Sequence, residues 1–389
     1  MKNNYKAFSV LIPDGEQTLL TNAINCFSQT ENVKIFIMSN DKNIKMRCSR
    51  YVHYFSYYPK ANNEIDWISN INKELNMHRI DIVMPVCEDG FRTIIKYQHL
   101  ISQKDKLCIL PTYDNFSIAI NKGLLSKHML DNQIACSKSI LLKPGEVYND
   151  NSLSFPVLAK PTVGAGGGNG IHKFSKKEDL KQFSIKNKIK HDYLIEEYIE
   201  GYDLGGNVLC KKGKIMAFTI QKGTLWGKKS FAPQIGQRFL YEHNLYIEVE
   251  KLMKSLSWSG VANIDLRFDK KDDKFKILEI NTRYWSSLTG STIAGVNFPY
   301  LYCLLSLNED FEKPEYRHIE YLNLAGTIKR IKNNIFFIFR FKFILNNTYV
   351  KFIIKDPLPT IYRVYIKVRN SLIYRFGNNK IGTHIFIVR

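Results

Sequence analysis

The stretch FKILEINTR, residues 275–283, decides the fold when it is taken together with VANIDLRF, residues 261–268. Both segments alternate apolar and polar residues as strands do, and the polar KDD sequence between them has the composition of a turn. A turn centred on Asp272 predicts a β-hairpin. In that hairpin Asp265 lies directly opposite Glu279 on the neighbouring strand.

Strand alternation then brings Glu279, Asn281 and Arg283 onto one face of the hairpin, beside Asp265. Carboxylates opposed at about 5 Å repel each other, and either solvent or a bound cation must compensate them. A solvated polar face is one interpretation. The other is a divalent cation, because two carboxylates and an amide are hard oxygen ligands that suit Mg²⁺ together with phosphate.

The composition describes a globular chain with an uneven charge. The 389 residues allow two or three domains, and the 44% hydrophobic content is ordinary. The formal net charge is +20. Residues 321–389 contain thirteen lysines and arginines and a single acid, Asp356, so they carry twelve of the twenty excess positive charges.

The seven cysteines are dispersed and form no CxxC pair, which predicts reduced thiols in a cytosolic protein and excludes a recognisable zinc site. The N-terminal apolar run is too short for a signal peptide. The most apolar window, residues 335–345, contains Arg340 and Lys342 and is about half the length of a membrane span. We expect a cytoplasmic protein that binds a membrane peripherally at most.

The first ~110 residues alternate short apolar runs with helix-compatible segments, as in an open parallel α/β domain. The helix-compatible segments include Glu16–Gln29 and Glu64–Met77, and the runs are FSVLIP, VKIFIMS, DIVMPV and KLCILP. From Lys122–Asn132 onward the pattern changes to α+β with antiparallel sheets. Its predicted strands are FPVLAKP, GIHKF, YLIEEYI, LGGNVLC and KIMAFTI, followed by a helix with an apolar stripe at Val249, Leu252, Met253 and Leu256.

A glycine-rich loop, residues 164–170, follows a predicted strand that ends in Lys160-Pro161 and precedes another strand. Glycines let backbone N–H groups approach an anion closely. A P-loop is excluded because Ile171-His172 stands where Lys-Ser/Thr is required, and no GxGxxG dinucleotide fingerprint matches. The pattern therefore favours a hairpin flap over phosphates, with a plain flexible linker as the alternative.

These motifs occur in an order that resembles the ATP-grasp superfamily, in the branch of carbamoyl-phosphate synthase large-chain halves and carboxylate–amine ligases. The order is Asn121-Lys122, then KPTVGAGGGNGI at 160–171, EEYIEGYD at 196–203, and the acidic hairpin. The resemblance covers roughly residues 1–300. It implies a Rossmann-like pre-ATP-grasp domain (1–115), an ATP-grasp domain of two subdomains that clasp ATP (116–315), and a basic aromatic extension (316–389).

The resemblance also implies a role for each motif residue. Lys122 and Lys160 would contact ATP phosphates, with Lys127 an alternative to Lys122. Asp203 would bind the ribose, and Arg283 with Lys160 would stabilise the transferred phosphoryl group. The hinge against adenine would be Glu196, Glu197, Tyr198 and Ile199, and the flap would include Gly166, Gly167 and Gly168. The ligands of Mg²⁺ would be Asp265, Glu279 and Asn281, with two ions bound and Mn²⁺ as a substitute.

The activity implied is an ATP-dependent ligase that activates a carboxylate as an acyl phosphate for attack by an amine. Phosphoryl transfer needs positioning and charge neutralisation rather than a nucleophilic side chain, so no Ser/His/Asp arrangement is required. The alternatives are carbamoyl-phosphate-synthase-like phosphorylation of a small carboxylate and a non-catalytic nucleotide-responsive binding protein.

Residues on the substrate side are harder to assign from sequence. Tyr284-Trp285 after the hairpin is expected to line the acceptor pocket, with Trp285 as a core residue in the alternative. Arg238, in a basic aromatic segment, is a candidate contact for phosphate or a substrate carboxylate. Glu88 follows a strand of the parallel domain, where α/β sheets place ligands, and is a candidate contact for the amine.

Residues 321–389 interleave aromatic and cationic side chains, and Val364, Tyr365, Val368 and Leu372 recur at helical spacing. This pattern favours docking on an anionic membrane or on a polyanionic partner. The alternative is a basic substructure that packs on the catalytic core. No recognised nucleic-acid-binding module is present, and no specific nucleic-acid binding is expected.

Overall fold

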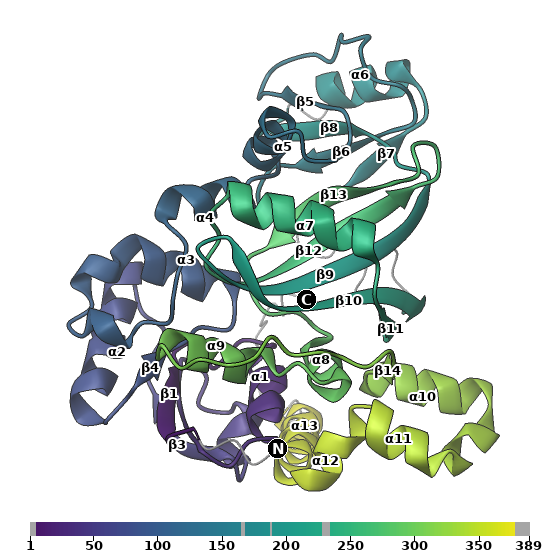
Figure 1. Ribbon diagram of the computed structural model, residues 1–389. Helices are drawn as coiled ribbons and strands as arrows, with labels where there is room; N and C mark the ends of the chain where they lie inside the picture. The colour runs from purple at the N-terminus through teal and green to yellow at the C-terminus, as the bar shows by residue number, and fades with distance from the viewer. Residues whose placement is uncertain (1–4, 165–167, 187–188, 228–233, 378–389) are drawn as a thin grey trace.

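The computed structural model describes residues 5–164, 168–186, 189–227 and 234–377. Its strands form three sheets with helices packed around them (Figure 1). The N-terminal sheet is parallel and the two sheets that follow are antiparallel. The predicted fold class is confirmed.

The parallel sheet has the strand order β3-β2-β1-β4, and its bounds are β1 Phe8–Ile12, β2 Val33–Ser39, β3 Val52–Tyr57 and β4 Ile82–Val83. Every residue of β1 is buried, as expected for a central strand covered on both faces. The sequence analysis missed β3. The strand predicted in KLCILP is wrong, because among the described residues this segment makes only a single parallel bridge, Val83 to Leu107.

Helices connect and cover these strands; their bounds are α1 Leu20–Phe27, α2 Glu64–Met77, α3 Glu88–Tyr97 and α4 Tyr113–Ile120. Short 3₁₀ turns lie between them at Lys45–Cys48 (η1), Gln98–Leu100 and Lys104–Lys106. The α2 helix begins where predicted, because the Asn63 side chain accepts a hydrogen bond from the Asp66 N–H and caps it.

Asp14, directly after β1, fixes the start of α3. Its buried carboxylate accepts hydrogen bonds from the N–H groups of Val86 (3.0 Å) and Cys87 (2.9 Å). Burial raises the pKa of Asp14 to about 7, although the backbone N–H groups oppose this shift. The result is a fixed loop that presents Glu88, the first residue of α3, at the edge of the parallel sheet.

The second sheet has the order β5-β8-β6-β7 and lies in the upper part of Figure 1, with α5 beside it and α6 above it. Its elements are α5 Lys122–Asp131, β5 Ser139–Leu142, β6 Val157–Pro161, β7 His172–Phe174, α6 Lys177–Lys186 and β8 Tyr193–Glu197. The β6 and β7 strands pair antiparallel, so the glycine-rich segment is the loop of a hairpin, as predicted.

The third sheet is the largest, with the order β13-β12-β9-β10-β11-β14. Its elements are β9 Gly201–Lys211, β10 Lys214–Leu225, β11 Gly236–Leu240, α7 His243–Ser255, β12 Gly260–Asp269, β13 Lys274–Asn281 and β14 Glu320–Leu322. The predicted stripe of α7 is fully buried against this sheet. A hydrogen bond from Ile277 N–H to the Ala135 carbonyl (2.9 Å) ties β13 to the segment after α5.

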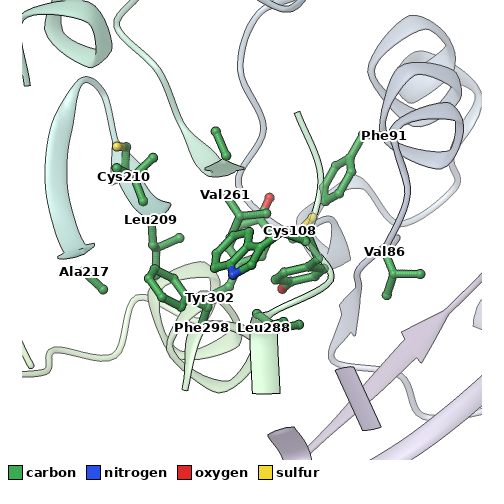
Figure 2. Close-up of a cluster of buried hydrophobic side chains, with 14 of the residues drawn as sticks. Val86, Phe91, Cys108, Leu209, Cys210, Ala217, Val261, Leu288, Phe298 and Tyr302 are labelled. Atoms are coloured by element: carbon green, nitrogen blue, oxygen red, sulfur yellow. The ribbon is translucent and has the colours of Figure 1, made fainter. Parts of the chain in front are cut away.

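One hydrophobic cluster continues from the parallel sheet into the large sheet (Figure 2). The ring of Phe91 of α3 stacks on that of Tyr302, with centroids 6.5 Å apart, and Val261 and Leu209 of the large sheet belong to the same cluster. Two helices fill the junction, α8 Leu288–Ala294 and α9 Phe298–Ser306. Because this core is continuous, the N-terminal part and the large sheet hold fixed positions relative to each other.

The chain continues in a helical C-terminal part, with α10 Leu324–Asn333, a 3₁₀ helix η5 Ile335–Phe339, α11 Phe341–Asn347, α12 Val350–Lys355 and α13 Leu358–Gly377. The predicted helix around Val364 is confirmed. The buried Asp356 accepts a hydrogen bond from Ser49 Oγ, which anchors this part on the N-terminal sheet. Among the described helices, none has the length and apolar content needed to span a bilayer. All seven cysteines are free.

Candidate functional site

The acidic hairpin β12–β13 has the predicted register. Asp265 pairs with Glu279 across the two strands, and the chain turns at residues 270–273. A bulge follows directly after this pair, because Leu266 pairs with Ile277 and leaves one extra residue on β13. The two carboxylates therefore occupy neighbouring positions on one face of the sheet.

Amide side chains extend this face on both sides of the carboxylates. Asn281 Nδ2 donates to Asp265 Oδ2 (3.1 Å) and to Asn263 Oδ1 (3.2 Å). Asn263 Nδ2 donates in turn to Asn207 Oδ1 on β9 (3.0 Å). Arg283 donates to Asn281 Oδ1 (3.1 Å) and to the Tyr284 carbonyl (2.9 Å). This network holds the predicted metal ligands and the arginine in fixed orientations.

The two carboxylates differ in their preference for a proton. Burial, followed by the facing charge of Glu279, raises the pKa of Asp265 well above its ordinary value. Burial also acts on Glu279, but the ammonium groups of Lys122 and Lys160 outweigh it and hold its pKa below the ordinary value. The lysines therefore act on Glu279, whereas at Asp265 the Asn281 amide and the charge of Arg283 only partly offset burial.

Lys122 and Lys160 reach this face from the second sheet. Lys122, the first residue of α5, places Nζ 3.1 Å from Glu279 Oε2. Lys160, on β6, is buried and forms an ion pair with the equally buried Glu196 of β8. Lys127 lies further along α5 and is exposed, so the geometry favours Lys122 over Lys127 for a role at the hairpin.

The glycine-rich flap, residues 164–170, follows the end of β6 at Pro161. Gly164 and Gly170 have φ values of +80° and +73°, a left-handed conformation that glycine adopts at no steric cost. Gly168 has φ +79° and accepts a hydrogen bond from Ile171 N–H (3.4 Å). Gly166 and Gly167 lie outside the described residues.

The hinge motif is organised by a residue that the sequence analysis did not select, Arg267 of β12. Its guanidinium donates to the carbonyls of Ile199 (2.8 Å) and Gly201 (3.0 Å), to Tyr198 Oη (3.2 Å) and to Asp203. Gly201 is required by packing, since a Cβ at this position would lie 1.8 Å from the Phe268 carbonyl oxygen.

The remaining hinge residues face in different directions. Glu196 points to Lys160, whereas Glu197 Oε1 accepts a hydrogen bond from Ser154 N–H (2.8 Å) at the edge of the sheet. The half-exposed Asp203 has Arg267 as a partner. Arg267 lies two residues after Asp265 and therefore on the same face of β12, which is a signal in the sequence that it lies near the site. The backbone carbonyls that accept its hydrogen bonds could not be recognised in the sequence.

On the substrate side the structure corrects one expectation. Tyr284 and Trp285 are buried in the central hydrophobic cluster, so they do not line an exposed pocket, and the alternative given for Trp285 is the correct one. Arg238 forms an exposed ion pair with Glu320 (2.7 Å). Glu88 does approach the site, because its Oε2 accepts a hydrogen bond from Thr282 Oγ1 (3.1 Å), between Asn281 and Arg283 in sequence.

The donor set fits a hard divalent cation. Asp265 and Glu279 supply carboxylate oxygens and Asn281 an amide oxygen, which are ligands typical of Mg²⁺. Burial and the facing charge of Glu279 raise the pKa of Asp265, and a cation bound by both carboxylates would offset the repulsion between them.

Sequence comparisons agree with this geometry. A family model described as "ATP-grasp in the biosynthetic pathway with Ter operon" matches residues 190–325. The D-alanine–D-alanine ligase of Rickettsia typhi is 25% identical over 176 residues, covering 43% of this chain and 54% of that protein. The D-aspartate ligase of Enterococcus faecium is 20% identical over 234 residues, covering 54% and 55%. The chain thus spans about half the length of these curated relatives.

Structural comparisons cover more of the chain. The N5-carboxyaminoimidazole synthetase of Staphylococcus aureus in complex with ADP has a TM-score of 0.64 at 14% identity and covers 86% of this chain and 87% of its own. The L-amino acid ligase of Bacillus licheniformis has a TM-score of 0.57 at 17% identity, with coverages of 80% and 75%. The family match, the curated ligases and this shared fold together support the ATP-grasp superfamily.

Proposed function

We propose that the protein is a Mg²⁺-dependent ligase that uses ATP to join a carboxylate to an amine. One observation carries the proposal: Lys122 of α5 and Lys160 of β6 act on Glu279 of the large sheet, which faces Asp265, and Arg283 follows the same strand. Such an arrangement can hold a triphosphate between the two sheets and neutralise its charge.

Each side chain has a distinct task in this proposal. Lys160 and Lys122 bind the phosphates, and the flap that includes Gly166, Gly167 and Gly168 closes over them. The hinge of Glu196, Glu197, Tyr198 and Ile199 contacts the adenine edge, and Asp203 the ribose. A divalent cation held by Asp265, Glu279 and Asn281 would neutralise charge on the terminal phosphates. Arg283 stabilises the transferred phosphoryl group.

The proposed reaction has two steps. A substrate carboxylate oxygen attacks the γ-phosphorus of ATP, which forms an acyl phosphate and releases ADP. The amine nitrogen then attacks the acyl carbon, expels phosphate and loses a proton, leaving an amide bond. The names of the relatives, which are ligases of D-alanine, D-aspartate and L-amino acids, support a carboxylate and an amine as the substrates.

Two fixed groups suggest where the amine binds. Glu88 is held at the start of α3 by the loop that Asp14 anchors, and it lies 3.1 Å from Thr282 Oγ1 beside Arg283. We propose that this carboxylate attracts the substrate ammonium. The corresponding domain division is 1–115, 116–315 and 316–389, with β14 of the third segment completing the large sheet.

The test is ADP release from Mg-ATP against a panel of carboxylates and amines. We expect release that requires one carboxylate and one amine, and a loss of about 10³-fold in Glu279→Gln, because the variant removes a carboxylate that would hold the cation on the terminal phosphates. The matched control is Asp273→Asn, in the turn of the same hairpin, which should retain activity. Full activity in Glu279→Gln would contradict the proposal.

A further inference from the structure

The C-terminal part forms a cavity with the catalytic core that the proposed ligase reaction does not use. Its walls come from α8, η5, α11 and α12. Four cationic side chains line it, Arg317, Arg340, Lys342 and Lys351, together with the aromatic rings of Phe339, Phe341 and Phe343. No Asp or Glu is among the described residues that line it.

Nearby acids are already engaged elsewhere. Glu320 pairs with Arg238, and Asp356 accepts a hydrogen bond from Ser49. Positive charge is therefore concentrated at the cavity, and burial together with the charges of Lys355 and Arg317 lowers the pKa of Lys351. A cavity of this kind suits an anion with several acceptor oxygens, such as a phosphodiester.

The rim of the cavity is apolar and exposed. Phe336 is 72% exposed and Phe339 66%, and Ile335 and Phe341 are exposed to a similar degree. The rings of Phe336 and Phe339 lie beside each other, with centroids 6.5 Å apart. We call the four side chains Ile335, Phe336, Phe339 and Phe341 the apolar rim. Water solvates such a rim poorly, and an acyl-chain phase solvates it well.

The neighbouring helix α13 has the same chemistry. Ile361, Val364, Tyr365 and Val368 are exposed along it, and Arg363 and Lys367 are exposed between them. Figure 1 shows α11, α12 and α13 grouped at one end of the molecule, away from the second sheet. An exposed apolar and basic helix that is too polar to span a bilayer is typical of a segment that lies in the membrane interface.

We propose that the cavity and the apolar rim form a docking surface for an anionic phospholipid bilayer. A lipid phosphate enters the cavity between the four cations, and the rim side chains enter the acyl region beside it. Each lysine or arginine at an anionic surface strengthens binding about fivefold. A free phosphate would use only the cations and leave the apolar rim in water, and a polyanion would do the same.

Flotation of the full chain with vesicles tests this surface. The probes are phosphatidylcholine vesicles with and without phosphatidylglycerol. We expect flotation with the anionic vesicles only, a loss of about 25-fold in Arg340→Gln/Lys342→Gln from two lost charges, and a loss of at least that size in Phe336→Ser/Phe339→Ser. Circular dichroism confirms that the variants are folded.

Matched controls lie at the opposite end of the molecule, on α6. Lys181→Gln and Ile185→Ser replace exposed residues of the same kinds and should leave flotation unchanged. Flotation that is absent, equal on neutral vesicles, or equally reduced in the α6 variants would overturn the proposal. Binding to soluble polyphosphate without flotation would also overturn it, in favour of a polyanionic partner. None of these outcomes depends on ligase activity.

Discussion

The acidic hairpin and the C-terminal extension are both highly charged, but their charges are compensated differently. Near the hairpin, Lys122 of α5 pairs with Glu279 of the large sheet, and Lys160 pairs with Glu196 within the second sheet. The cavity of the extension contains four cations and no acid among its described lining residues. The fold therefore supplies acidic partners for the cations near the hairpin, whereas the described lining of the cavity supplies none.

The largest effect is expected from breaking the buried pair. Lys160→Met leaves Glu196 buried without a partner, which should lower the free energy of unfolding by about 3–5 kcal/mol. The double variant Lys160→Met/Glu196→Met should recover most of this stability, as measured by chemical denaturation. If Lys160 binds phosphate, the double variant will regain its free energy of unfolding but not its rate of ADP release. Recovery of both would show that the pair has a structural role only.

A buried charge without any cationic partner gives the next largest effect. The pKa of Asp14 is raised to about 7, so between pH 4 and 7 the folded state binds more protons than the unfolded state. Stability should therefore fall as pH rises through this window, by about 3 kcal/mol in total. The new side chain in Asp14→Asn can still accept a hydrogen bond from the N–H groups of Val86 and Cys87. Denaturation curves at several pH values should show that its free energy of unfolding depends less steeply on pH. An unchanged slope would contradict the assignment.

A smaller effect on ATP binding is expected at the hinge, where Arg267 donates hydrogen bonds to two backbone carbonyls and a tyrosine hydroxyl. Arg267→Met removes the donors to Ile199, Gly201 and Tyr198, and we expect the KM for ATP to rise about tenfold with a smaller change in kcat. Lys276→Met is the matched control, since it removes a cation of the same hairpin that pairs with Asp269 and Asp272. Equal increases in the KM for ATP in both variants would contradict a specific role of Arg267 at the hinge.

The smallest effect on stability is expected in the extension. Because Lys342 is exposed and has no acidic partner among the described residues lining its cavity, Lys342→Gln should change the free energy of unfolding by less than about 0.5 kcal/mol. Thermal denaturation measures this directly. A loss of unfolding free energy comparable to that in Lys160→Met would contradict the difference in charge compensation between the hairpin and the extension.

Much of the hairpin could be predicted from sequence, because the period of strand side chains and a polar turn fix the register. Asp265 does face Glu279, and α2 has its predicted bounds. The edge strand β3 could not be recognised, since its residues are only half-buried or exposed and carry no clear apolar run. The failed strand prediction around Leu107 has the opposite cause, because a largely half-buried apolar run lies there without pairing over its length.

Contacts between distant segments were the part that sequence could not supply. Arg267 bonds to carbonyls more than sixty residues earlier in the chain, and backbone acceptors leave no trace in residue identity. The burial of Tyr284 and Trp285 depends on how the large sheet meets the N-terminal part, which no local pattern encodes. The choice of Lys122 over Lys127 likewise required the position of α5 relative to β13.

The central claim is that the acidic hairpin binds ATP through a divalent cation. Calorimetric titration of ATP in the presence and absence of Mg²⁺ tests it most directly, with Asp265→Asn and Glu279→Gln beside the Asp273→Asn control. The account predicts Mg²⁺-dependent binding that weakens about 100-fold in the two site variants and is unchanged in the control. Binding of equal strength with and without Mg²⁺, or equal losses in all three variants, would contradict it.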